Sequence, residues 1–367
     1  MKETAMRKAF LFTCAYNAES TIRRCLDSVL CQSFTDFNYH IVDHGSTDNT
    51  AEILAEYARK DPRISTERIE QNVGGITVSH AAKMADRNTA GYFSTLDADD
   101  EYAPDFLEKM LAFAIDNSLD VACCGTDWTD KRNGNFIKRI VQDKHIILEG
   151  KDFAEYFPVY RNYMANVWGA VYSLELLRGC SFEWVKKAPD FHDTAFVMET
   201  FRRAKRAGIF AEGLHKYYVS SDPHPHKFNP DWFKACKYLD KISREYLLDY
   251  GPISRNNEHF LYVQLLILIK YVLPRIQNAD AGLGEKLKLL SEIFNDGETQ
   301  HMLKQWSELG IYSDRGEFLQ EIKEWIISQD RWKDHQVTAE AIFSNIDKHN
   351  HGKESSIGIF DDEVERK

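Results

Sequence analysis

The feature of this sequence that most constrains its fold is the alternation of short apolar runs with helical patterns over its first half. Apolar runs that predict strands occupy 8–15, 37–43, 64–69, 90–96 and 119–125. Apolar residues at helical spacing predict helices over 22–30, near 53–57, over 76–87 and over 104–115. Strands that alternate with helices are typical of a mostly parallel sheet, so the sequence predicts an α/β domain.

The second half of the chain predicts a different organisation. The segment KRNGNF is typical of a hairpin turn, and 166–177 predicts a strand followed by a helix. An amphipathic helix is expected over 192–208, ending at Gly208, before a last strand over 214–220. Beyond this strand every strong signal is helical. We therefore expect an α/β domain at 1–225, a helical module at 226–348 and a polar, disordered tail at 349–367.

Composition narrows the class of protein further. The chain has 367 residues, of which 43% are hydrophobic and 13% aromatic, enough for a sizeable interior. Its formal net charge of −11 argues against a nucleic-acid partner, because phosphate backbones attract basic surfaces. The seven cysteines lack metal-ligand spacing, which predicts free thiols in a reducing compartment rather than disulfides or zinc.

We expect neither an export signal nor a membrane span in this sequence. Its first residues, MKETAMRKAF, lack the long apolar core of a signal peptide. The most apolar stretch, 260–273, is interrupted by Gln264 and Lys270 and is too short to cross a bilayer. These observations predict a cytoplasmic protein and leave open a peripheral contact with the inner face of the membrane. The helical module could serve an acceptor, a membrane surface or a partner subunit.

Polar clusters follow three of the predicted strands: YNAE at 16–19, DHGSTD at 43–48 and DADD at 97–100. Ligands of open α/β sheets bind outside the carboxyl ends of the strands, so these clusters are expected to meet. The carboxylates of DADD repel one another, and a hard divalent cation would cancel that repulsion. A diphosphate is the natural second partner of such a cation. A simple acidic turn before a helix is the alternative, and the coincidence of three clusters favours the cation.

These segments resemble the family 2 glycosyltransferases, which have the GT-A fold. The resemblance is dense over 8–125, where it includes FTCAYNAEST, FNYHIVDHGSTDNT, NVGG and YFSTLDADDEYAPDFL. It resumes in VWGAVYSLELL and HDTAFV. The resemblance implies a Rossmann-like, mostly parallel sheet with flanking helices. It also implies a metal-dependent, inverting transfer of a hexose from a nucleotide sugar, with UDP as the expected nucleotide. The acceptor would be a hydroxyl of a glycan, lipid-linked or protein-linked molecule.

The resemblance also implies roles for individual residues. The donor-binding residues would lie in the first loop, in the pair that faces the nucleobase and in the D-x-D motif: Cys14, Ala15, Tyr16, Asn17, Glu19, Asp43, His44, Asp97 and Ala98. Asp99, with Asp97, would hold Mn²⁺ or Mg²⁺, and His224 or His226 would add a ligand from a loop. Asp193 would be the general base.

Several positions depart from the common pattern of the family. His44 stands where many members have Asp, and His192 replaces the usual Glu before Asp193. The Arg-Asn pair that often follows the Gly-Gly is missing, and His80 or Lys83 could stand in for it. Asp190 is a rival general base.

Two functional readings from different classes therefore remain. The first is an active glycosyltransferase, which the joint presence of Asp97, Asp99 and Asp193 favours. The second is a non-catalytic nucleotide-sugar-binding or scaffold subunit that keeps the GT-A fold. Trp168 could stack on a sugar or belong to the core.

Overall fold

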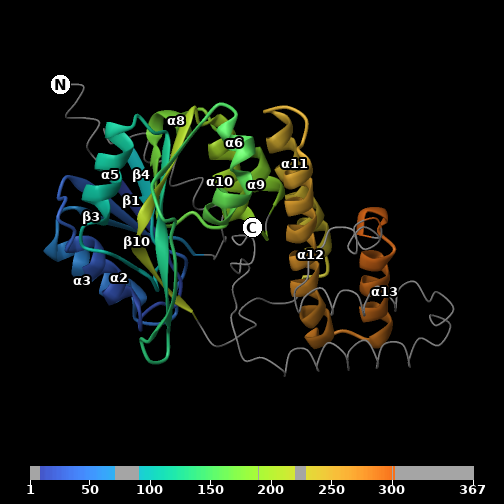
Figure 1. Ribbon diagram of the computed structural model, residues 1–367. Helices are drawn as coiled ribbons and strands as arrows, with labels where there is room; N and C mark the ends of the chain where they lie inside the picture. The colour runs from blue at the N-terminus through green and yellow to red at the C-terminus, as the bar shows by residue number, and fades with distance from the viewer. Residues whose placement is uncertain (1–8, 71–90, 189, 220–228, 300, 302–367) are drawn as a thin grey trace. The chain divides into compact units, whose positions relative to one another are not determined.

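The computed structural model describes residues 9–70, 91–188, 190–219, 229–299 and 301 (Figure 1). The chain divides into two compact units. The first comprises Met1–Ser221 and Tyr246–Gly251, and the second comprises Asp222–Glu245 and Pro252–Lys367. The domain limits at 225 and 348 remain predictions, and the polar tail at 349–367 lies outside the described residues.

The first unit is built on a ten-stranded sheet in which eight strands follow the order β3-β2-β1-β4-β9-β6-β10-β5, while β7 pairs with β6 and β8 pairs with β10. Four parallel strands form one half: β1 (Ala9–Ala15), β2 (Phe37–Asp43), β3 (Ile64–Arg68) and β4 (Tyr92–Thr95). They confirm four of the predicted strands. Ala15 pairs with Asp43 at the carboxyl ends of β1 and β2, so the loops that leave these strands start side by side.

The other half of the sheet mixes strand directions. It contains β5 (Glu101–Tyr102), β6 (Val121–Asp130), β7 (Phe136–Ile140), β8 (Ile146–Glu149), β9 (Ala170–Ser173) and β10 (Arg206–Val219). Strand β9 lies antiparallel between β4 and β6, and β10 runs parallel to β6. Strand β5 pairs His215 with Tyr102 and Lys216 with Glu101. The acidic segment after β4 is therefore tied directly to β10.

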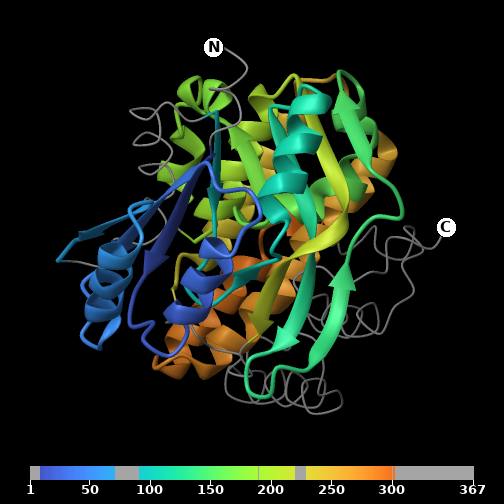
Figure 2. The ribbon, with the colours of Figure 1, turned by 90° about the vertical axis from the view of Figure 1, so that its left-hand side faces the viewer.

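Helices cover both faces of this sheet (Figures 1 and 2). On one face lie α2 (Ile22–Leu30), α3 (Thr50–Lys60) and α5 (Phe106–Asp116), whose apolar residues join the sheet in one core. Leu26 and Phe106 are fully buried there, and each such side chain stabilises the fold by about 1.5–3 kcal/mol. The other side carries α6 (Asp152–Glu155), α7 (Phe157–Tyr160), η1 (Arg161–Met164), α8 (Leu174–Arg178), α9 (Glu183–Lys187) and α10 (His192–Arg203).

The expected helix over 192–208 is too long. Helix α10 ends at Arg203, and β10 begins at Arg206, eight residues before the predicted strand at 214. Gly208 does not cap a helix: a Cβ there would lie 2.5 Å from Leu119 and 2.7 Å from Phe113, so glycine allows the strand to approach α5. The expected hairpin turn is confirmed, because β6 pairs with β7 across it. The predicted helix at 76–87 lies outside the described residues.

The second unit is helical as far as it is described. Most of α11 (Trp232–Leu248), together with α12 (Arg255–Asn278) and α13 (Leu283–Phe294), belongs to it, and the predicted breaks near Gly251 and Gly282 separate these helices. The Ser254 side chain caps α12 by accepting a hydrogen bond from the Asn257 backbone N–H at 3.2 Å. Within the described ranges, every helix is too short or too polar to cross a membrane. All seven cysteines lie in these ranges and are free thiols, as predicted.

Candidate functional site

Two loops at the carboxyl ends of β1 and β2 are joined by hydrogen bonds into one surface. The Asn17 backbone N–H donates to Ser46 Oγ at 2.9 Å, and the Thr47 N–H donates to Asn17 Oδ1 at 2.8 Å. Asn17 adopts a left-handed conformation with φ of 47°, which asparagine tolerates better than most residues. Glu19 accepts from the Asn49 backbone and side chain at 3.0 and 2.8 Å, so it anchors the start of α3.

Asp43 and His44, the pair expected to face the nucleobase, are buried next to this surface. The buried Asp43 carboxylate accepts from the Ser46 N–H at 3.0 Å and pairs with Arg68 at 2.8 Å. The buried His44 places Nε2 3.1 Å from Cys14 Sγ. Gly45 has φ of +75°, and a Cβ there would lie 2.9 Å from the Glu70 carbonyl oxygen, so glycine is required for this turn.

Not all of the predicted first loop is buried in this way. Ala15 is buried at the end of β1, whereas the next residue, Tyr16, is 50% exposed. The Ala15 carbonyl accepts from the His44 N–H at 2.9 Å, which joins the two strand ends. Tyr16 therefore offers an aromatic face beside the strand ends.

The acidic turn follows β4 directly. The Leu96 N–H still bonds the Phe12 carbonyl at 3.0 Å, and the turn then closes with the Asp100 N–H bonding the Asp97 carbonyl at 3.1 Å. Asp97 is exposed, Asp99 is partly exposed and Asp100 is fully buried. Asp99 Oδ2 lies 3.0 Å from Lys131 Nζ. The turn therefore presents the first two carboxylates of DADD outward and keeps the third inside.

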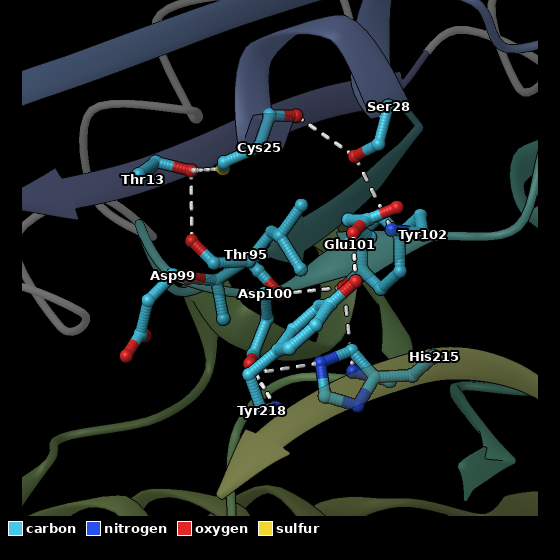
Figure 3. Close-up of polar contacts among 12 residues, drawn as sticks. Thr13, Cys25, Ser28, Thr95, Asp99, Asp100, Glu101, Tyr102, His215 and Tyr218 are labelled. Carbon is cyan, nitrogen blue, oxygen red and sulfur yellow. Dashed lines mark hydrogen bonds and ion pairs between the residues drawn. The ribbon is translucent and has the colours of Figure 1, made fainter. Parts of the chain in front are cut away.

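Asp100 holds the turn to β10 (Figure 3). Its Oδ1 accepts from the Tyr218 N–H at 2.9 Å, and its Oδ2 lies 3.2 Å from Nε2 of the fully buried His215. The Trp168 ring stacks on the His215 ring, with the two ring centroids 4.1 Å apart. Burial lowers the pKa of His215 to about 3, so this imidazole is neutral at ordinary pH.

Arg24, on α2, also holds the acidic turn in place. Arg24 donates to the Asp99 carbonyl at 2.5 Å and pairs with Glu101 at 2.9 Å. Its guanidinium also lies 3.6 Å from the centre of the Tyr218 ring, whose hydroxyl donates to Glu101. The sequence interpretation missed these partners: Arg24, Lys131, His215 and Tyr218. His215, Tyr218 and Lys131 reach the turn through the pairing of β10 with β5 and β6, which the local sequence does not indicate, and Arg24 reaches it from α2.

The charges of this cluster are incompletely balanced. The surrounding protein, followed by the carboxylates of Asp100, Asp193 and Asp99, raises the pKa of the Asp97 side chain well above its usual range. Burial, and then the charge of Asp99, raise the pKa of Asp100 in the same direction. Excess negative charge on hard oxygen donors is the environment that a divalent cation stabilises. The residues present therefore fit Mn²⁺ or Mg²⁺ at Asp97 and Asp99.

Protein ligands alone do not complete such a metal site in the described part of the chain. No group of three or more His, Cys, Asp or Glu side chains is arranged there to hold an ion. His224 and His226, the expected additional ligands, lie outside the described residues. A cation at Asp97 and Asp99 would thus need other oxygens, which a bound diphosphate can supply.

Asp193 brings a further carboxylate to the same place. It lies in the first turn of α10, with its Oδ1 3.3 Å from His192 Nε2. The surrounding protein raises the pKa of Asp193, although its side chain keeps 35% of its surface exposed, and His192 acts in the opposite direction. The negative charge of Asp193 contributes to the raised pKa of Asp97. The rival Asp190 lies in the turn before the helix.

The buried Asp100 leads to a prediction about stability and pH. Because burial raises its pKa, the folded protein holds this proton more tightly than the unfolded chain does, and ionisation of Asp100 destabilises the fold as pH rises above about 4. Asp100→Asn keeps an acceptor for the Tyr218 N–H and cannot ionise. We expect its free energy of unfolding, relative to wild type, to increase from pH 5 to pH 8 in urea titrations with EDTA. A difference that does not change with pH would contradict this.

Comparison with known proteins identifies the class to which this arrangement belongs. The family model described as "Glycosyl transferase family 2" matches residues 11–174, which span β1 to the start of α8. This segment therefore matches glycosyltransferase family 2, and the expected resemblance to that family is confirmed.

Individual relatives agree with this assignment. "Uncharacterized glycosyltransferase YibD" of Escherichia coli (strain K12) is 25% identical over 303 residues, which cover 78% of this chain and 84% of YibD. A chondroitin synthase of Escherichia coli is 38% identical over 125 residues, which cover 34% of this chain and 18% of the synthase.

Solved structures establish the fold. The crystal structure of Staphylococcus aureus TarS 1–349 in complex with UDP superimposes with a TM-score of 0.64 at 17% identity. The superposition covers 96% of this chain and 94% of the TarS chain. The expected GT-A fold with flanking helices is confirmed, although the sheet is mixed rather than mostly parallel, because β5, β7, β8 and β9 pair antiparallel with their neighbours.

Proposed function

We propose that this protein transfers a hexose from a UDP-linked sugar to a hydroxyl group of an acceptor, with inversion at the anomeric carbon and with a divalent cation at the donor diphosphate. One observation carries the proposal: the turn with Asp97 and Asp99 follows β4, which pairs in parallel with β1, so these carboxylates lie at the same edge of the sheet as the joined loops after β1 and β2, within the segment that matches glycosyltransferase family 2. Asp193, in the first turn of α10, is the candidate base. The UDP in the TarS complex supports the choice of nucleotide.

The acceptor is the least constrained part of this proposal. It would be a growing glycan, a lipid-linked sugar or a glycosylated protein. The chondroitin synthase named among the relatives builds a polysaccharide, by its name, and supports the first of these.

The donor would bind across the strand ends. The hydrogen-bonded loops after β1 and β2 would bind the nucleoside. Tyr16 would offer an exposed aromatic face, and the buried Asp43 and His44 would support it. Asp97 and Asp99 would hold the cation, which, when bound, neutralises negative charge on the leaving diphosphate. Arg24 and Asp100 would keep the turn in place through its backbone and through β10.

Asp193 would accept the proton of the acceptor hydroxyl as that hydroxyl attacks the anomeric carbon. A carboxylate with a raised pKa is a better base than an ordinary one and is still ionised at neutral pH if the rise is modest. A diphosphate is a good leaving group when its charge is neutralised, so a second carboxyl acting as general acid, as in glycoside hydrolysis, is not needed. Asp193 alone would then provide the acid–base chemistry.

The proposed function is tested by assaying the protein with a set of nucleotide-sugar donors. Purified protein with Mn²⁺ is incubated with UDP-, GDP- and TDP-linked hexoses, alone and with polysaccharide fragments as acceptors, and nucleoside diphosphate release is recorded. We expect release from a UDP-sugar that disappears with EDTA. Metal-dependent binding of donors without release under any condition would support the binding-subunit reading instead. If the protein neither binds any donor nor releases nucleoside diphosphate, both the transferase reading and the binding-subunit reading are contradicted.

A further inference from the structure

One ammonium group lies directly on the carboxylate that we assign to the cation. Lys131 is the first residue after β6, and its Nζ is 3.0 Å from Asp99 Oδ2. The two side chains are 38% and 43% exposed. Ion pairs this exposed are weak, so the pair can open without disturbing the fold.

The backbone of Lys131 is fixed although its side chain is exposed. Its N–H donates to the Val219 carbonyl at 3.0 Å, which joins it to the end of β10. The turn that follows is closed by the Gly134 N–H to the Asp130 carbonyl at 2.8 Å. The ammonium can therefore change partners, but only within the reach of one lysine side chain around the acidic turn.

The other cations near the acidic turn have different partners. Arg24 bonds the Asp99 carbonyl and Glu101 and stacks on Tyr218. Lys216 lies 3.9 Å from Glu101 and 4.8 Å from the centre of the Tyr218 ring. Of these three side chains, Lys131 is the one whose charge is placed on the Asp99 carboxylate itself. It is therefore the cation that competes with a metal ion.

This placement links the cation to the diphosphate. An ion that binds alone competes with the Lys131 ammonium for Asp99, because two cations on one carboxylate repel each other. When a diphosphate binds with the ion, the displaced ammonium finds a new anionic partner close by. Lysine is well suited to this role, since its ammonium binds phosphate as a mobile point charge.

We propose that Lys131 is a diphosphate-binding residue that exchanges the Asp99 carboxylate for the donor diphosphate, so that the cation and the nucleotide bind cooperatively. The inference rests on the proposed function, because it takes the acidic turn as the site of the donor diphosphate. Its distinguishing consequence is that loss of the ammonium has opposite effects on the two ligands. A residue with a merely structural role would weaken both or neither.

The test uses the full chain and Lys131→Met. Affinity for Mn²⁺ alone is measured from the electron paramagnetic resonance signal of the free ion, and affinity for UDP is measured by calorimetry in saturating Mn²⁺. We expect Lys131→Met to bind Mn²⁺ alone about twofold to fivefold more tightly, since an exposed ion pair no longer competes. We expect it to bind UDP about tenfold more weakly or worse, since a charge-assisted contact is lost.

Two variants provide controls. Lys131→Arg keeps the charge and should stay close to wild type in both measurements. Lys138→Met removes a lysine from β7, whose ammonium lies 4.8 Å from the centre of the Trp128 ring, and should also match wild type.

The outcomes separate this inference from the proposed function. If wild type binds Mn²⁺ and UDP and Lys131→Met leaves both affinities unchanged, or moves them in the same direction, the inference is overturned and the proposed function stands. If wild type binds neither ligand, the proposed function is overturned and the inference with it.

Discussion

Replacing Asp193 by asparagine is expected to lower the rate of sugar transfer about 10²–10⁴-fold, the usual contribution of a general base. Asparagine keeps the size of the side chain, so α10 and its contacts should be preserved. The same change should leave the dissociation constant of the donor within about twofold, because the base acts on the acceptor proton and not on the nucleotide. Initial rates at saturating donor, together with calorimetric donor binding, measure both quantities.

The neighbouring Asp190→Asn is the matched control. It removes a carboxylate three residues earlier, in the turn before α10, and should retain the rate of wild type. If Asp190→Asn lost the activity and Asp193→Asn kept it, the base would be Asp190.

The pH profile gives a second check on the base. Because the base must be ionised, the rate should fall as pH decreases through its pKa. The raised pKa of Asp193 moves this acidic limb above the position of an ordinary carboxyl group. An acidic limb at the ordinary carboxyl position would argue against Asp193 as the base.

The second large effect is expected at Asp99. Asp99→Ala removes a cation ligand, and we expect nucleoside diphosphate release to fall on the order of 10²–10³-fold, since stabilisation of the leaving group by a metal is worth several kcal/mol. EDTA should reduce wild type to a similar level and should have little further effect on Asp99→Ala. Two changes that act on one interaction are not additive.

Asp105→Ala provides the matched control for Asp99→Ala. Its carboxylate follows the acidic turn by a few residues, pairs with Lys109 at 2.8 Å and is 42% exposed, against 43% for Asp99. This variant should keep both its rate and its sensitivity to EDTA. An Asp99→Ala enzyme that remained active and metal-dependent would contradict the assignment of the cation to this residue.

Much of the fold and part of the site could be predicted from the sequence, because both depend on parallel strands. The apolar runs predict strands β1, β2 and β4, and the parallel pairing of these strands brings the three polar clusters to one edge. Asp97 and Asp99 follow β4 as their motif implied. Their roles remain proposals.

The supporting residues His215, Tyr218 and Lys131 could not be predicted, because their positions depend on the mixed half of the sheet. The pairing of β10 with β5 and β6 is nonlocal, and nothing in the local sequence around His215 or Tyr218 indicates it. Gly208 resembles a helix cap in sequence, and its true role depends on the neighbouring Phe113 and Leu119. Lys131 is brought to Asp99 by the same nonlocal pairing of β6 and β10.

In the proposed function, the acidic turn after β4 binds a cation together with the donor diphosphate. The most direct test is a crystal structure of the protein grown with Mn²⁺ and UDP, with the manganese located by its anomalous scattering. We predict a single manganese within about 2.5 Å of an Asp99 carboxylate oxygen and in contact with the UDP diphosphate. Manganese bound elsewhere, or UDP bound away from the strand ends with no metal at Asp97 and Asp99, would contradict it.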